Sequence, residues 1–100
     1  VFNFVPGLGA CGFTNTSDQL VASVSSQTFH SFPYALTSMY SNPICTHDLT
    51  VSFNGTNVTA QIVDFCISCP AEDVGFSAAA FEKFAPTEQG IVQNVTWVID

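Results

Sequence analysis

The amino-acid sequence predicts a mostly-β domain whose strands close into a barrel and which has one clear, short helix. Apolar and polar side chains alternate with period two along several segments, and an Asn-Gly pair at 54–55 separates the two strongest of them. Apolar residues make up 47% of the chain and charged residues only 9%, which is typical of a chain that buries a core. A closed barrel would leave these strands without a long unpaired edge.

The strands can be assigned in chain order. Residues 2–5 are expected to form the first strand, and Leu20, Ala22 and Val24 share one face of the second. The most secure pair is a hairpin of residues 49–53 and 58–63 around Asn54-Gly55, because Asn-Gly favours the tight turn that two antiparallel strands need. The last strand is indicated by a repeat of apolar residues at Ile91, Val95, Trp97 and Ile99.

The one clear helix is predicted to start at Ser77, a good N-cap, and to run to Ala85, before Pro86. Phe81 and Phe84 lie three residues apart and should dock this helix on the sheet. By contrast, residues 26–44 contain two prolines and four aromatic side chains, and we expect an irregular loop or a broken strand there.

The length of 100 residues, without an internal repeat or a linker, predicts one domain spanning residues 1–100. No apolar run approaches the roughly 20 residues of a membrane helix, and the chain starts at Val1 without a leader, as a mature or trimmed chain would. We therefore expect no membrane partner, and we expect a monomer.

The charge balance argues against several classes of partner. The net charge is −7, Lys83 is the only basic residue besides two histidines, and there is no arginine. Nucleic acids, nucleotides and anionic membranes are bound largely through lysine and arginine, so none of them is an expected partner. Glycine-rich phosphate-binding motifs are also absent, and no cofactor is predicted.

Two features indicate secretion. The chain has an even number of cysteines, four, and its N-x-S/T sequons are candidate glycosylation sites. The cysteines are Cys11, Cys45, Cys66 and Cys69, and the sequons stand at Asn15, Asn54, Asn57 and Asn94. A eukaryotic secreted glycoprotein, extracellular or in the cell wall, is the interpretation that these features favour.

The C-x-x-C at Cys66 and Cys69 could be a redox site, part of a zinc site or a disulfide. A redox cysteine usually lies at a helix N-terminus, whereas Pro70 and two acidic residues follow here. A zinc site would need a second close pair of ligands, so no metal is predicted. Four cysteines allow three disulfide pairings; we favour Cys11–Cys45 with Cys66–Cys69, and the alternatives cross the two pairs.

Asp64 is the carboxylate that the pattern singles out. It continues the core-facing phase of Val58, Ala60 and Ile62, so it must either accept hydrogen bonds from loop amides or lie in a groove. The first alternative is structural and the second functional, and the pattern leaves both open.

Six segments, in order along nearly the whole chain, resemble a known family. They are "GLGACG" (7–12), "SDQLVASVS" (17–25), "NPIC" (42–45), "LTVSFNGTNVTAQIVDFCISC" (49–69), "FSAAAFEKFA" (76–85) and "GIVQNVTW" (90–97). Together they are similar to small secreted fungal double-psi β-barrel proteins of the expansin-like or loosenin-like type, relatives of rare lipoprotein A, barwin and the family-45 endoglucanases. The resemblance implies a six-stranded double-psi β-barrel with one or two short helices and a groove that binds polysaccharide.

The resemblance also implies site residues. Asp64 matches the groove aspartate of the family, whereas the second family aspartate, which acts as an acid in some relatives, is replaced by Gly75. Asp73 could substitute for it, and Asp18 is a further candidate groove carboxylate. Tyr34 and Tyr40 are the aromatic candidates, because a ring can stack on a sugar face.

These expectations give three candidate functions. The leading one is a non-lytic, non-enzymatic module that binds cell-wall polysaccharide such as cellulose, chitin or a related glycan around Asp64. The alternative is a protein-interaction module, such as a cysteine-protease inhibitor or a secreted effector, since related double-psi barrels include papain-family inhibitors. The third is a weak lytic enzyme that uses Asp64, although glycoside hydrolysis generally needs two carboxyl groups and Gly75 supplies none.

Overall fold

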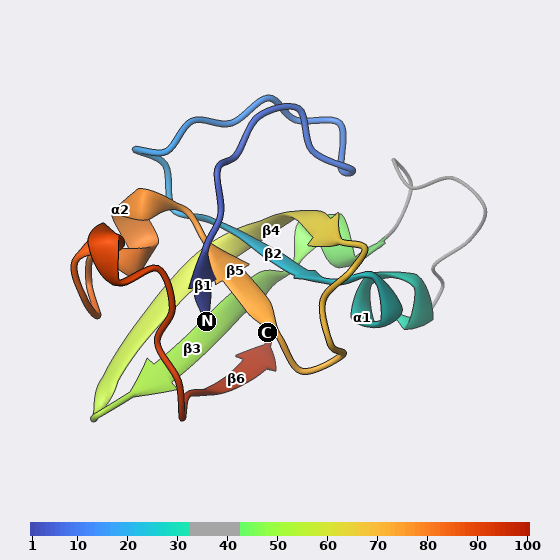
Figure 1. The fold of residues 1–100 in the computed structure, drawn as a ribbon. Coiled ribbons are helices and arrows are strands. Elements are labelled where there is room, and N and C mark those ends of the chain that lie inside the picture. The colour runs from blue at the N-terminus through green and yellow to red at the C-terminus, as the bar shows by residue number, and fades with distance from the viewer. Residues whose placement is uncertain (33–42) are drawn as a thin grey trace.

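The structure is a computed structural model that describes residues 1–32 and 43–100. Within these ranges, six strands form one mixed sheet in the order β1-β5-β2-β4-β3-β6 (Figure 1). The strands are β1 (Phe2–Asn3), β2 (Val21–Ser25), β3 (Asp48–Phe53), β4 (Thr56–Cys66), β5 (Val74–Phe76) and β6 (Thr96–Ile99). The helices are α1 (Ser26–Ser31) and α2 (Ala78–Phe81), with 3-10 turns η2 (Pro43–Thr46) and η3 (Thr87–Gln89). The predicted mostly-β fold with six strands and short helices is confirmed.

The sheet combines parallel and antiparallel pairs. β1 pairs with β5, and β2 with β4, in parallel; the three remaining pairs are antiparallel. Ile91, in the segment that leads into β6, forms an isolated antiparallel bridge with Phe2 of β1. The two edge strands are therefore linked through this segment, as expected of strands that close on themselves.

The β3–β4 hairpin is as predicted. Val51 pairs with Val58 and Leu49 with Ala60, and all four side chains are buried. Asn54 and Gly55 have φ values of 50° and 79°, the left-handed pair that a two-residue turn requires. Local turn chemistry and hydrophobic alternation agree here, so the sequence alone predicts the register.

Strand β2 does not alternate as predicted. All five of its residues are buried, while Leu20 lies outside the strand and is 44% exposed. The strand lies between β5 and β4, and because consecutive side chains point to opposite faces of a sheet, the burial of all five residues means that both faces are covered. A strand covered on both faces carries no period-two signal.

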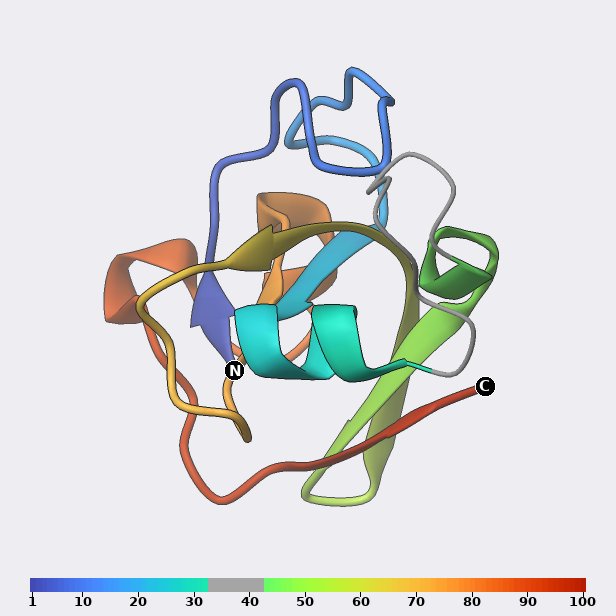
Figure 2. The same cartoon turned by 90° about the vertical axis from the view of Figure 1, so that its right-hand side faces the viewer.

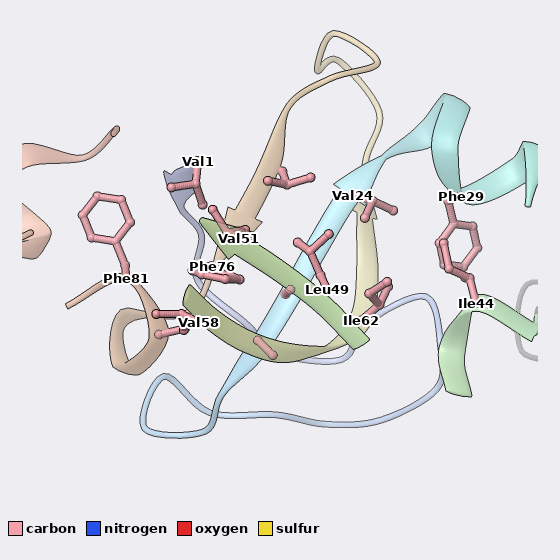
Figure 3. Packing of buried hydrophobic residues seen from close by; sticks show 14 of the residues in the cluster. Val1, Val24, Phe29, Ile44, Leu49, Val51, Val58, Ile62, Phe76 and Phe81 are labelled. Carbon is pink, nitrogen blue, oxygen red and sulfur yellow. The ribbon is translucent and has the colours of Figure 1, made fainter. Parts of the chain in front are cut away.

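The prediction of an irregular segment from residue 26 is wrong for its first six residues, which form α1. Ser25 is the N-cap, and its hydroxyl accepts the N–H of Thr28 at 3.1 Å. Phe29, on the buried side of α1, points toward Ile44 of η2 (Figure 3). The helix covers one end of the barrel, as the view in Figure 2 shows.

Helix α2 is shorter than predicted and is capped differently. It ends at Phe81 rather than Ala85, and the Ser77 hydroxyl donates to the carbonyl of Gln19 instead of capping the helix. The expected docking is present, because Phe81 is fully buried and the ring of Phe84 stacks at 6.0 Å from that of Phe76. The last strand is also shorter than predicted, since Ile91 is 47% exposed and lies outside β6.

The core fills the space between the strands and both helices. Its labelled members in Figure 3 are Val1, Val24, Phe29, Ile44, Leu49, Val51, Val58, Ile62, Phe76 and Phe81, all of them buried. The structure contains the disulfides Cys11–Cys45 and Cys66–Cys69, which is the pairing that we favoured.

In the described ranges, no helix combines the length and apolar character that crossing a membrane would require.

Candidate interaction site at the carboxyl end of strand β4

Asp64 lies at the end of β4, and two backbone amides hold its carboxylate. The N–H of Ala10 donates to Asp64 Oδ1 at 3.1 Å, and the N–H of Phe65 donates to the same oxygen at 2.8 Å. The side chain is half-buried. Of the two alternatives that the pattern left open, hydrogen bonding is thus observed, with one loop amide, that of Ala10, and one amide of β4 itself, that of Phe65.

A β-bulge interrupts the alternation of residues along β4 from which a core-facing Asp64 was predicted. Ala22 of β2 pairs with Ile62, but Ser23 pairs with Asp64, so Val63 is an extra residue on β4. Val63 is buried like Ile62, and its carbonyl accepts the N–H of Cys11 at 3.1 Å. The simple alternation from Val58 to Asp64 therefore does not hold beyond Ile62.

The same part of the sheet contains Gly75, the residue at the place of the second family aspartate. Ser23 pairs with Asp64 on one side and with Gly75 on the other, so the three residues occupy one row across β4, β2 and β5. A Cβ at position 75 would lie 2.6 Å from Ser23 Oγ and 2.9 Å from a ring carbon of Phe2. The space next to Gly75 is therefore filled by Phe2 and Ser23, and an aspartate does not fit there without movement of these side chains.

The other predicted carboxylates lie in different surroundings. Asp18 is exposed in the loop before β2, where the Thr16 hydroxyl donates to it and holds its pKa below the usual value. Asp73 is exposed just before β5 and borders a surface hollow with Val1 and residues 91–95. The contacts of Asp64, by comparison, are with Ala10 and Phe65. The structure does not gather the three carboxylates into one cluster among the described residues.

The aromatic candidates Tyr34 and Tyr40 lie outside the described residues. A second hollow is bordered by residues between Glu82 and Glu88, after α2, and like the first it does not include Asp64. Within residues 1–32 and 43–100, no group of three or more histidine, cysteine or acidic side chains is arranged to hold a metal ion. Cys66 and Cys69 are joined to each other as a disulfide.

A segment that sequence reasoning did not single out as a site lies directly over Asp64. It connects β1 to β2, and its residues 9–11 pack on β4: Gly9, Ala10 and Cys11 are buried, and a Cβ at Gly9 would collide with the carbonyl oxygen of Val63. In Figure 1 this blue segment runs across the top of the barrel. On either side of the packed residues, Val5, Leu8 and Phe13 are 84%, 72% and 45% exposed. The available signal was a stretch of apolar residues and glycines, residues 4–13, without a charge.

The order of the strands and their mixed pairing define the class of protein: the fold is an expansin-like double-psi β-barrel. The structure superposes on Streptomyces papain inhibitor with a TM-score of 0.84 and 28% identity, covering 98% of this chain and 87% of that one. It also superposes on an expansin of Clavibacter michiganensis in complex with cellohexaose, with a TM-score of 0.75 and 21% identity, covering 99% of this chain and 47% of that one. No family model matches the chain.

The sequence comparison agrees with the first of these structures. The chain is 33% identical over 95 residues to the papain inhibitor of Streptomyces mobaraensis, covering 91% of this chain and 62% of the relative. It thus spans less than two thirds of the length of that curated relative. The relative that both comparisons share is by name a papain inhibitor, in agreement with the prediction that the chain is not an enzyme. These relatives are bacterial, so they give no support to the predicted fungal origin.

Proposed function

We propose that this chain is an extracellular inhibitor of papain-like cysteine proteases. The observation that carries the proposal is the combined likeness to a papain inhibitor: 33% identity over 95 residues in sequence, and superposition over 98% of the chain in structure. The expansin, at 21% identity, supports the fold alone. From the sequence, protease inhibition was the alternative to polysaccharide binding. The likeness to a papain inhibitor makes it the leading candidate function.

The surroundings of Asp64 support the same choice. A carboxylate oxygen that already accepts two backbone N–H groups has less capacity to accept bonds from sugar hydroxyls. The second acidic residue that the family resemblance implies is also absent, since Gly75 stands in its place and Phe2 and Ser23 fill the space beside it. What remains at this end of β4 is a structural carboxylate that fixes a loop, which suits a protein-binding surface.

The proposal includes the setting in which the protein acts. Both disulfides are typical of an oxidising compartment, which is consistent with secretion. We treat residues 1–100 as a single, monomeric domain. The sequons at Asn54, Asn57 and Asn94 are exposed and that at Asn15 is half-buried, so the first three are the better candidates for glycosylation if the host attaches N-glycans.

A panel of proteases tests the proposal. Residual activity is measured for papain, for a second papain-like enzyme and for a serine protease such as trypsin, each with up to a hundredfold excess of the chain. We expect inhibition of the cysteine proteases and none of trypsin. Equal inhibition of all three, or of none, would contradict a specific cysteine-protease inhibitor.

Polysaccharide binding is the second candidate, and the observation that favours it is Asp64 itself. The carboxylate is half-buried near the end of β4 on a fold shared with an expansin, and among residues 1–32 and 43–100 its hydrogen bonds are to Oδ1. Retention on cellulose, chitin and xylan is measured for the wild type, for Asp64→Asn and, as a control, for Asp48→Asn at the exposed first residue of β3. Retention that Asp64→Asn alone abolishes would favour this candidate, and no retention of the wild type at low salt would remove it.

A further inference from the structure

We propose that residues 5–14, here called the β1–β2 loop, are the inhibitory surface and enter the active-site cleft of the protease. This inference rests on the proposed function and names the part of the chain that performs it. Three properties of the loop support it: a fixed shape, exposed apolar side chains and the absence of charge.

The loop is held in one shape by contacts along its length. Leu8 and Thr14 form an antiparallel bridge. The N–H of Gly9 donates to the carbonyl of Phe13, and the N–H of Asn15 donates to the carbonyl of Gly7, each at 3.0 Å. These bonds make residues 7–15 a small hairpin. A loop that is ordered before binding loses less conformational entropy in the complex, which increases its affinity.

The tip of this hairpin is fixed to the barrel. Asp64 accepts the N–H of Ala10, the carbonyl of Val63 accepts the N–H of Cys11, and the disulfide to Cys45 attaches Cys11 to η2. Asp64 thereby has a role in this proposal that differs from sugar binding. It positions the β1–β2 loop and does not contact the partner.

Leu8 is the best candidate for an anchor in the partner. It is 72% exposed, and it stands between Gly7 and Gly9. Neither neighbour has a side chain that could obstruct the approach of a partner to Leu8. Val5 and Phe13 add exposed apolar surface within the same nine residues. Other exposed apolar side chains, such as Ile67 and Val98, lie in other segments.

The charge distribution fits insertion into a cleft. Residues 1–17 contain no charged side chain, although the whole chain has a net charge of −7. Burial of a charge in an interface is costly unless the charge is paired, and this loop has none to bury. A protease cleft binds polypeptide backbone with apolar side chains in its pockets, so the exposed, uncharged side of this hairpin, which presents Leu8, matches it in chemistry.

The test compares Leu8→Asp with Val98→Asp, a matched control on β6 where Val98 is 60% exposed. Inhibition constants against papain are measured for both variants, for Leu8→Ala and for the wild type, and thermal unfolding shows whether each variant is folded. We expect the inhibition constant to rise roughly 100-fold or more for Leu8→Asp and at least about tenfold for Leu8→Ala, because a central anchor contributes a large share of the binding energy. For Val98→Asp, the inhibition constant should stay within about threefold of the wild-type value.

A second measurement does not depend on variants. Hydrogen exchange of the wild type is compared with and without excess papain whose catalytic cysteine has been blocked by alkylation with a small reagent, and slower exchange in peptides covering residues 5–14 is expected. If the wild type inhibits papain while Leu8→Asp inhibits it equally well and these peptides gain no protection, the loop is not the inhibitory surface and the proposed function stands. If the wild type does not inhibit, both proposals fail.

Discussion

At the scale of single residues, Gly75 is where this barrel departs from the family pattern that its sequence resembles. The resemblance placed Gly75 at the position of the second family aspartate, and the strand pairing shows it in one row with Ser23 and Asp64. The sequence could not predict that Phe2 and Ser23 fill the space beside Gly75, since Phe2 is more than 70 residues away in the chain. The place of the aspartate in the family motif is thus taken in this fold by the packing of Phe2 and Ser23 against Gly75.

We predict that Gly75→Asp destabilises the protein by about 2 kcal/mol or more, because the new side chain would overlap Phe2 and Ser23 and would bury a charge. The free energy of unfolding is measured by urea denaturation. Gly7→Ala is the control, since a Cβ there meets nothing within 4 Å, and its effect should stay within about 0.5 kcal/mol. A Gly75→Asp variant as stable as the wild type would show that an acid can be accommodated at this position.

Asp64 illustrates a partial success at the same scale. The predicted phase of β4 does not extend to Asp64, but one of the two alternatives, hydrogen bonding to a loop amide, is observed at the N–H of Ala10. The choice between them could not be made from sequence, because the partner amide of Ala10 is 54 residues away and the bulge at Val63 breaks the alternation.

At the scale of elements, prediction succeeded where the signal is local. The β3–β4 hairpin follows from alternation and from Asn54-Gly55, all within residues 48–61. Strand β5, by contrast, has three residues, one of them glycine, and was not predicted; it exists because it pairs with β1 and β2. Helix α1 was missed because its sequence, SQTFHS, has weak helix propensity and owes its stability to the Ser25 cap and the burial of Phe29.

The two disulfides should contribute unequally. Cys11–Cys45 closes 34 residues and Cys66–Cys69 only 3, so the chain-entropy relation gives about 4 kcal/mol for the first and about 2 kcal/mol for the second. We therefore predict that Cys11→Ala/Cys45→Ala lowers the midpoint of denaturation more than Cys66→Ala/Cys69→Ala does. It should also weaken papain inhibition, since it releases the β1–β2 loop. The reverse order of stabilities would contradict the assigned roles.

At the scale of the whole molecule, the net charge of −7 is carried by residues outside the β1–β2 loop, which has no charged side chain. Long-range attraction would steer this protein toward proteases with a positively charged rim, and salt screens such attraction, with a Debye length of about 30 Å at 0.01 M and about 8 Å at 0.15 M. We predict that the association rate constant with a basic protease falls about tenfold between these salt concentrations while the dissociation rate constant changes little. Stopped-flow measurements at both concentrations check this, and equal association rates would exclude steering.

Inhibition of papain by the intact chain is the central claim, and a titration measures it directly. Active papain at fixed concentration is mixed with increasing amounts of the chain, and the rate of hydrolysis of a peptide substrate is recorded. The proposed inhibitor should reduce the rate to zero at about one molecule per active site if it binds tightly, or along a competitive binding curve with a micromolar constant or better. Full papain activity at a hundredfold molar excess of the chain would contradict the claim.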